Sequence, residues 1–292
     1  MSMNTVPERL AALRAAMQAN GVDVYLIPVG DPHSSEYLPD HYTSLTYFSG
    51  FHGENSNFVV TMTESAVWAD GRYFVQAEKE IAGTEIQLMK MGEPGVPTVE
   101  EYCAKVVPEG GKLGLCGLTA SCALVNGVKK ALEPKHAAIK TLFLEDELWT
   151  EGRPALPATP AWILPKEYAG FSPAEKLGQL RAKLSELGCT AQLVGKLDNL
   201  AWLLNLRAMD IQWSPYAMAY FFFFNDKGYK DFYTAAKAET DGLQQVIVLA
   251  GCNQQGAQHA TVEGCAGQLF AAGIAAFGEQ AQQQPHNAHS DQ

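Results

Sequence analysis

The feature that most constrains this chain is a helix–strand unit that occurs twice, with its key positions 167 residues apart. The first copy opens with the capping box Thr5-Val6-Pro7-Glu8 and the second with Ser172-Pro173-Ala174-Glu175. Behind each box, apolar residues recur on one helical face and a glycine ends the helix: Leu10, Leu13, Met17 and Gly21, then Leu177, Leu180, Leu184 and Gly188. An apolar strand is predicted after each helix, over 22–28 and 191–194.

The similarity continues beyond the strands. Leu45-Thr46-Tyr47-Phe48 has a counterpart in Leu200-Ala201-Trp202-Leu203, at the shorter offset of 155 residues. Such regular spacing predicts two tandem α/β units, the second with a shorter connecting loop. Capped amphipathic helices are common, so a chance likeness between two unrelated helices is the alternative.

Four prolines at 154, 157, 160 and 165 mark the boundary between the units, because proline at this density prevents helices and inner strands. We therefore predict an α/β domain over 1–155, a linker over 156–166 and a second, incomplete α/β domain over 167–240. A hairpin with arms 219–224 and 230–234 belongs to the second domain. Residues 241–292 form a tail rich in glycine, alanine and glutamine, whose end we expect to be disordered.

The composition is that of a globular protein, with 47% hydrophobic and 18% charged residues. A net charge of −11 argues against nucleic acid as the main partner. No apolar run is long enough for a membrane span, and we expect no secretory signal, because no basic segment leads into an apolar one at the amino terminus. Six scattered cysteines then indicate reduced thiols in the cytoplasm, with Cys103 and Cys189 predicted as small core residues.

Apolar segments at 45–51, 58–61 and 66–69, separated by polar turns, are typical of a hairpin that leads into a capped helix. Asp70-Gly71-Arg72-Tyr73 follows the last segment. Asp70 is predicted to accept hydrogen bonds from free amides of a helix that begins near Arg72. This structural role accounts for the motif, and a contact between Arg72 and a substrate is the alternative.

Two further groups of residues could carry function. Asp31, His33 and Glu36 lie close together at the end of a strand, where they could hold a metal or simply form a capping turn. Arg207 and Asp210 could pair locally or present a charge to another domain. Dinucleotide, phosphate-loop, Gly-x-Ser-x-Gly and His-Glu-x-x-His motifs are absent from the sequence. We therefore predict no catalytic and no metal-binding residues.

Six ordered blocks resemble the cytosolic, longer-chain branch of the aminopeptidase P and creatinase family. They are 27–37, 49–51, 68–77, 89–92, 148–154 and 201–207. The resemblance implies two tandem ribonuclease-H-like domains of the creatinase N-terminal type, the second incomplete here. In the family, a "pita-bread" catalytic domain follows and binds two divalent metals, usually manganese, through two Asp, a His and two Glu. No segment of this chain resembles that domain, so no metal is expected in it.

The resemblance implies a non-catalytic amino-terminal region that serves subunit association and shapes substrate access, as a homodimer or bound to a catalytic domain. His33, Arg72, Arg207 and Asp210 would be its substrate-access or interdomain contacts. A complete or partner-complemented metalloaminopeptidase, which releases the residue before proline, is the alternative. The turn at 52–56 and Ala208 depart from the family pattern, which leaves a truncated or frame-shifted product or a diverged stand-alone paralogue open.

Overall fold

The computed structural model describes residues 5–224 and 247–248. The chain divides into two compact units, Met1–Leu156 and Pro157–Gln292, called unit 1 and unit 2 below. The division lies at the start of the proline-rich segment. None of the helices in the described ranges is long and apolar enough to cross a membrane.

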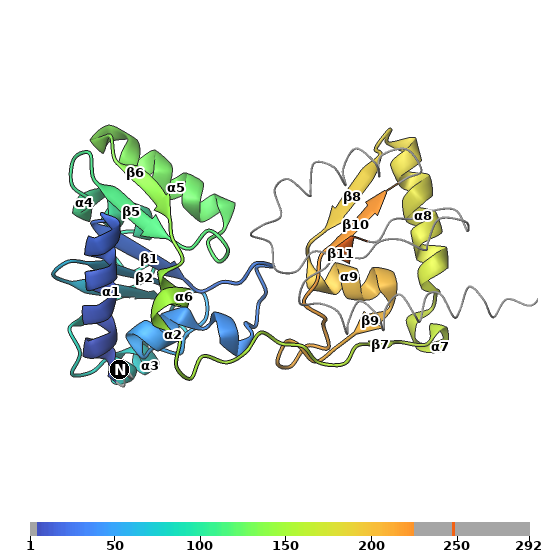
Figure 1. The fold of residues 1–292 in the computed structure, drawn as a ribbon, viewed down its shortest axis with the longest axis horizontal. Helices are drawn as coiled ribbons and strands as arrows, with labels where there is room; N and C mark the ends of the chain where they lie inside the picture. The colour runs from blue at the N-terminus through green and yellow to red at the C-terminus, as the bar shows by residue number, and fades with distance from the viewer. Residues whose placement is uncertain (1–4, 225–246, 249–292) are drawn as a thin grey trace, which may run out of the picture. The chain divides into compact units, whose positions relative to one another are not determined.

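Unit 1 is built on a mixed sheet of six strands in the order β4-β3-β2-β1-β5-β6 (Figure 1). The strands are β1 Val24–Pro28, β2 Asn57–Thr61, β3 Ser65–Ala69, β4 Ile86–Lys90, β5 Lys112–Leu115 and β6 Ala138–Thr141. Strand β2 is antiparallel to both of its neighbours, whereas the β1–β5, β5–β6 and β3–β4 pairs are parallel. The predicted α/β fold class is confirmed, and β2 and β3 form the predicted hairpin.

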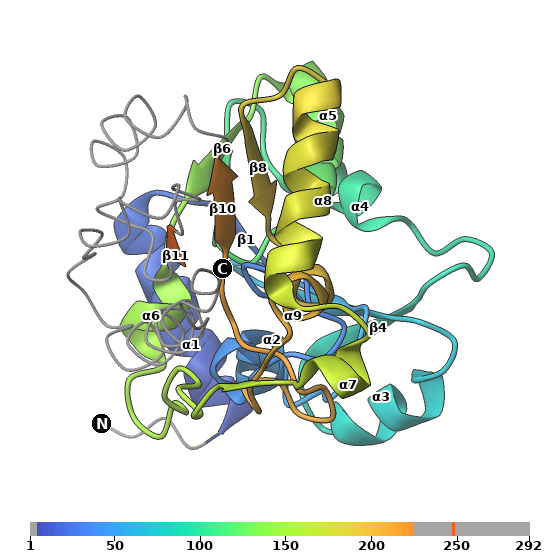
Figure 2. The ribbon, with the colours of Figure 1, turned by 90° about the vertical axis from the view of Figure 1, so that its right-hand side faces the viewer.

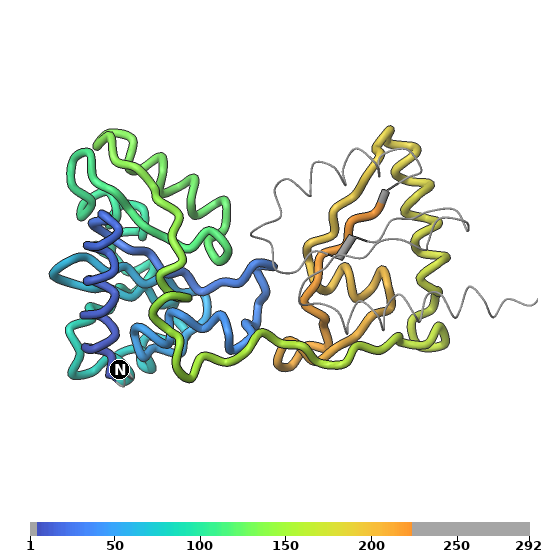
Figure 3. Tube along the Cα trace, in the orientation of Figure 1, coloured from blue at the N-terminus to red at the C-terminus, as the bar shows by residue number. Residues whose placement is uncertain are grey.

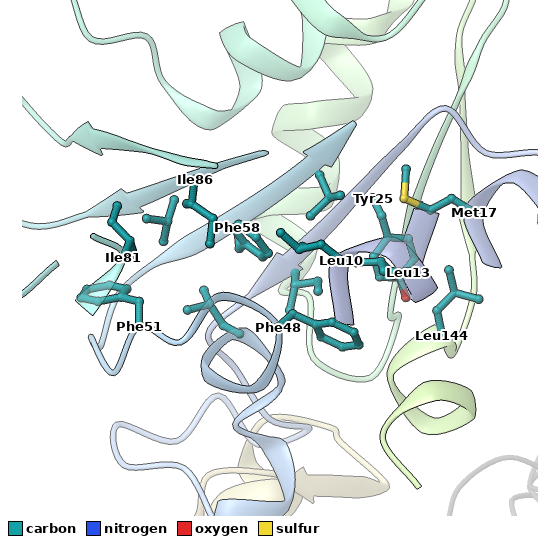
Figure 4. Packing of buried hydrophobic residues seen from close by; sticks show 14 of the residues in the cluster. Leu10, Leu13, Met17, Tyr25, Phe48, Phe51, Phe58, Ile81, Ile86 and Leu144 are labelled. Carbon is teal, nitrogen blue, oxygen red and sulfur yellow. The ribbon is translucent and has the colours of Figure 1, made fainter. Parts of the chain in front are cut away.

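Helices cover both faces of this sheet. They are α1 Val6–Asn20, α2 Ser44–Ser49, α3 Phe74–Glu80, α4 Val99–Val106, α5 Cys122–Leu132 and α6 Leu144–Leu148, with short 3-10 turns at Asp40–Tyr42 and Glu133–Lys135. On one face, Leu10, Leu13 and Met17 of α1 lie in the same cluster as Tyr25 and Phe58 of the sheet (Figure 4). A second cluster lies between the other face and helices α4 and α5.

Unit 2 has a smaller sheet in the order β11-β10-β8, in which β8 is antiparallel to β10. Its elements are β7 Trp162–Ile163, α7 Lys166–Ala169, α8 Pro173–Glu186, β8 Ala191–Val194, α9 Leu197–Leu204, β9 Leu206–Arg207, β10 Phe221–Phe224 and β11 Ile247–Val248. Figure 2 shows α8 running alongside β8 and β10. Leu184 of α8, Leu200 and Leu204 of α9 and Phe221 and Phe223 of β10 form the buried cluster of this unit.

The predicted repeat is present in the structure. Both capping boxes form, since Thr5 and Ser172 accept hydrogen bonds from the amides of Glu8 and Glu175, whose carboxylates bond back to the cap amides. Strands β1 and β8, which follow the two capped helices, each pair with an antiparallel strand, and equivalent residues of the two strands lie opposite a phenylalanine. Ile27 of β1 opposes Phe58 of β2, and Val194 of β8, 167 residues after Ile27, opposes Phe221 of β10.

Several local predictions are wrong. Residues 44–49 are the helix α2 rather than part of an extended arm, although their counterpart in unit 2, α9, is also helical. Helix α3 begins at Phe74 and has no side-chain cap. Cys103 is buried as predicted, but Cys189 is exposed, because it follows the end of α8 rather than packing under it.

The segment predicted as a linker also contains a strand. Within 156–166, β7 pairs antiparallel with β9 through Trp162 opposite Arg207. Figure 3 traces the chain from α6 through this segment into unit 2. The two residues of this strand lie between Pro160 and Pro165, so no proline has to donate an amide hydrogen bond in the pair. The second arm of the hairpin at 230–234, and the tail over 241–292 apart from β11, lie outside the described residues.

Candidate functional site

The polar residues that the sequence singles out in unit 1 lie at one edge of its sheet. Because β2 is antiparallel to β1 and to β3, strands β1, β3, β4, β5 and β6 all point the same way and end at the same edge. The loops that follow β1, β3 and β5 carry His33, Arg72 and Cys116. In α/β sheets this carboxyl-terminal edge is where ligands bind most often.

The loop after β1 is held by its own aspartate. The buried Asp31 accepts hydrogen bonds through Oδ1 from the amides of His33 and Ser35, both at 2.9 Å. Gly30 allows a close approach to the β5 loop, since a Cβ atom there would lie 2.4 Å from the carbonyl oxygen of Thr119. The structure therefore supports a structural turn, in which His33 is a buried part.

The metal interpretation of this loop is not supported. Asp31 and His33 are buried whereas Glu36 is exposed, so the three side chains do not converge. Across the described ranges, no group of three or more His, Cys, Asp or Glu side chains is placed to share a metal ion. Although the three residues are close in sequence, the fold buries Asp31 and His33 and leaves Glu36 at the surface.

Arg72 is the most accessible of the four predicted residues, with 62% of its side chain exposed. Its guanidinium pairs with Asp70 at 2.7 Å and lies 3.8 Å from Glu54 and 5.2 Å from the ring centre of Tyr73. Hydrogen bonds from the Arg72 side chain lower the pKa of Asp70 to about 2. Asp70 also accepts the Arg72 amide at 2.9 Å, so it caps the turn rather than the helix that was predicted.

This arrangement limits the chemistry of Arg72. A guanidinium between two carboxylates is already neutralised, and exposed pairs of this kind contribute little to stability. It can orient a polar or anionic group at the surface by exchanging one carboxylate for it. It has no nucleophile to activate, so the cluster suits binding rather than bond cleavage.

In unit 2, Arg207 and Asp210 do not pair with each other, so the predicted local ion pair is wrong. Arg207 donates through Nη1 to the carbonyl oxygens of Ala201 at 2.6 Å and Leu206 at 2.9 Å, at the end of α9. Asp210 is buried and accepts hydrogen bonds from Thr159 and from the amide of Met218. Each charge thus holds backbone groups within its own unit.

Sequence reasoning missed a buried lysine in unit 2. Lys176 of α8 is 2% exposed, and its Nζ donates to the carbonyl oxygen of Trp202 and to Oδ1 of Asn205, both at 2.6 Å. Burial and the nearby Arg207 lower the pKa of this amine. Lys176 is three residues from Pro173 on the inner face of α8, and this position in the helical pattern was the available signal.

It also missed a buried acid in unit 1. Glu145 of α6 is 4% exposed and accepts a hydrogen bond of 2.6 Å from the hydroxyl of Tyr25, which also lies 3.3 Å from the carbonyl oxygen of Leu142. Burial raises the pKa of Glu145 to about 7 and raises that of Tyr25 as well. A tyrosine inside an apolar strand needs a polar partner for its hydroxyl, which was the signal in the sequence.

The segment after α6 is anchored by aromatic and cationic groups. Trp149 stacks on Tyr47 of α2 with ring centres 4.5 Å apart, Arg9 lies over the Tyr47 ring, and Arg153 lies over the Trp149 ring. Arg153 also pairs with Asp146. These contacts belong to unit 1 and fix the path of the chain where it leaves the sheet.

The comparisons with known proteins agree with this architecture. The creatinase/prolidase N-terminal domain family matches twice, over residues 9–144 and over 152–266. Aminopeptidase P2 of Arabidopsis thaliana is 38% identical over 220 residues, which are 74% of this chain and 31% of that protein. A probable Xaa-Pro aminopeptidase P of Sordaria macrospora is 36% identical over 86% of this chain and 41% of its own length.

A solved structure is similar over nearly the whole chain. The X-prolyl aminopeptidase of Caenorhabditis elegans, described as a cytosolic enzyme with a di-nuclear active site, matches with a TM-score of 0.70 and 27% identity. The match covers 98% of this chain and 46% of that structure. The chain therefore spans less than half the length of these relatives.

Proposed function

Because the chain belongs to the creatinase/prolidase N-terminal family and carries two such domains in tandem, we propose that it is the non-catalytic amino-terminal region of an Xaa-Pro aminopeptidase-like protein. In this role it serves subunit association and shapes the access of substrate to an active site carried elsewhere. The relatives named above are aminopeptidases, and the matched part of each is less than half of its length.

The observation that carries the proposal is that buried charged side chains in both units make hydrogen bonds inside their own unit. Asp31 holds amides of its own loop, Asp210 and Lys176 hold atoms of segments distant in sequence, and Glu145 bonds to Tyr25 in the core. A peptidase needs a polarised water and a stabilised oxyanion, which metal ions supply in metallopeptidases. Groups engaged in internal hydrogen bonds serve a scaffold, and Arg72 is the predicted residue left for surface contact.

We place this function in the cytoplasm. The six cysteines are scattered without a zinc-ligand spacing, and the C. elegans relative is described as a cytosolic enzyme. The expected partners are a second copy of the chain or a polypeptide that carries the catalytic part.

An activity assay tests the non-catalytic role. The purified chain, supplied with Mn²⁺ and an Xaa-Pro peptide, is expected to show no turnover above buffer. Turnover that stays with the protein through further purification would instead support the alternative, a complete or partner-complemented metalloaminopeptidase. Light scattering over a wide concentration range tests association, and a mass that remains monomeric throughout would contradict pairing between copies.

A further inference from the structure

The loop after β1 contains a carboxylate of which only one oxygen is satisfied within the protein. Oδ1 of Asp31 accepts two backbone amides, whereas Oδ2 is enclosed and has no hydrogen-bond partner among the described residues. We propose that this loop binds a monovalent alkali cation between Oδ2 of Asp31 and Oγ of Ser35. The proposal goes beyond the proposed function and does not depend on it, because it rests on the chemistry of one loop in unit 1.

The negative charge of Asp31 is buried without a counter-charge. The residue is 3% exposed, and within 5–224 no lysine, arginine or histidine forms an ion pair with it. The two amides that bond to Oδ1 stabilise the carboxylate through their dipoles but do not neutralise it. Enclosing an ionised group without an opposite charge is strongly destabilising, and a bound cation removes that cost.

A second enclosed oxygen belongs to Ser35. Its Oγ atom is shielded from solvent and also has no hydrogen-bond partner among the described residues. The amide of Ser35 bonds to Oδ1 of Asp31 at 2.9 Å, so the hydroxyl of the same residue is held beside the carboxylate. Buried polar atoms in native proteins nearly always have a partner, which is a bound water or ion where the chain supplies none.

The loop after β5 adds a main-chain oxygen next to these two atoms. A Cβ atom at Gly30 would lie 2.4 Å from the carbonyl oxygen of Thr119, so this oxygen lies directly against the residue before Asp31. Carbonyl oxygens are neutral ligands that replace the water shell of an alkali cation in potassium-selective filters. One carboxylate among neutral oxygens therefore suits a cation with a single positive charge.

The same features argue against a divalent metal and against water. Mg²⁺ keeps several waters and Ca²⁺ takes about six to eight oxygen ligands. Oδ2 of Asp31 and Oγ of Ser35 are both shielded from solvent, which leaves no place for such a shell. A metal held by Asp31, His33 and Glu36 is a different arrangement, which the exposure of Glu36 excludes. A water molecule would bond to both oxygens but would leave the charge of Asp31 uncompensated.

Rubidium tests the position of the site directly. Rb⁺ substitutes for K⁺ or Na⁺ and scatters X-rays anomalously. Crystals of the full chain grown in rubidium chloride are expected to show an anomalous peak between Oδ2 of Asp31 and Oγ of Ser35.

Thermal unfolding of the full chain tests binding in solution. The chain is compared in KCl, in NaCl and in tetramethylammonium chloride at one ionic strength, because tetramethylammonium is too large for an enclosed site. A cation that binds the folded loop is expected to raise the unfolding midpoint of unit 1 by about 4 °C at ten times its dissociation constant. Hydrogen exchange should also slow at the amides of His33 and Ser35, which bond to Asp31.

Matched variants assign the effect to the loop. Asp31→Asn keeps an oxygen for the two amides but removes the charge, and it should abolish the rise in midpoint. Ser35→Ala should raise the cation concentration needed about tenfold, and it provides the test if Asp31→Asn does not fold. Asp40→Asn makes the same change at an exposed carboxylate and should keep the full rise. Circular dichroism checks that each variant is folded.

Three outcomes would overturn the proposal. If the midpoint is the same in all three salts and the density between the two oxygens has no anomalous signal, the loop holds an ordered water only. If rubidium gives no peak beside Asp31, the cation does not bind there. If Asp31→Asn and Ser35→Ala both keep the full rise in midpoint, the cation acts at another place in the chain.

Discussion

The two units begin with the same helix and strand but surround the strand differently. In unit 1, β1 has a neighbour on each side and buried clusters on both faces of the sheet. In unit 2, β8 has one neighbour among the described residues and a buried cluster beneath α8 and α9. The same helix–strand sequence pattern therefore gives a fully buried strand in one unit and a largely exposed strand in the other. A strand is stabilised by its cover more than by its own residues.

The largest expected difference between the units is in their resistance to unfolding. We predict that residues 1 to about 155 fold independently and that unit 2 is marginal, because the sheet of unit 1 is covered on both faces. Limited proteolysis should leave a resistant fragment that ends near the proline-rich segment. A fragment from about 167 to 234 that outlasts unit 1 would contradict this.

The difference in stability between the two units can be tested at one pair of equivalent phenylalanines. Phe58 and Phe221 are both buried, and they lie opposite the equivalent residues Ile27 of β1 and Val194 of β8. We expect Phe58→Ala to lower the free energy of unfolding by about 5 kcal/mol and Phe221→Ala by about 3 kcal/mol, because fewer neighbouring residues hold the second cavity open.

Urea denaturation followed by a probe in each unit measures both values. Phe58→Leu and Phe221→Leu keep most of the volume and serve as controls. Equal losses for the two alanine variants would show that the smaller cluster is as rigid as the larger one.

Glu145 should make unit 1 depend on pH in a way that unit 2 does not. Its pKa is about 7 in the folded chain, above the ordinary 4.5, so folding favours the protonated acid. This contribution is complete below about pH 4.5 and is lost as the pH rises through about 7. The loss amounts to about 3 kcal/mol at pH 8.

The variant Glu145→Gln tests this cause. It should keep the bond to Tyr25 and flatten the fall in the urea midpoint of unit 1 between pH 5 and pH 8. The difference between variant and wild type isolates this residue from other titrating groups. A fall of the same size in both proteins would assign the pH dependence elsewhere.

The smallest expected effects concern the two capping boxes. Thr5→Ala and Ser172→Ala each remove one side-chain acceptor from a helix amide and should cost about 1 kcal/mol. The costs should be similar because a cap is a local interaction. Thermal unfolding of each variant, with Thr5→Ser as a conservative control, measures them. A cost several times larger at Ser172 would mean that this cap supports contacts beyond its helix.

The sequence was sufficient to predict a feature where the interacting residues are close to each other in the chain. Both capping boxes, the glycine at the end of α1, the β2–β3 hairpin and the repeat of 167 residues could be read from local pattern. Each depends on residues a few positions apart, for which spacing and geometry are tightly linked. The family resemblance extended this reading to both domains.

Contacts between residues far apart in the sequence decided the partners of the buried polar and charged side chains. Tyr25 meets Glu145 across 120 residues, Thr159 meets Asp210 across 51, and Lys176 meets Asn205 across 29. Arg207 and Asp210 are close in sequence, yet each is satisfied by other backbone groups. A buried charge takes whichever donors or acceptors the packing supplies, and the local pattern does not reveal them.

The sequence by itself determined most of the elements, their order and the presence of two similar units. Only the tertiary structure decided which strand would be fully buried and which would keep exposed side chains. The residues of β1 and β8 both predict a strand, but burial depends on the strands and helices that arrive from elsewhere in the chain. Local hydrogen bonds set a strand's conformation, whereas the hydrophobic cover that stabilises it is a property of the whole sheet.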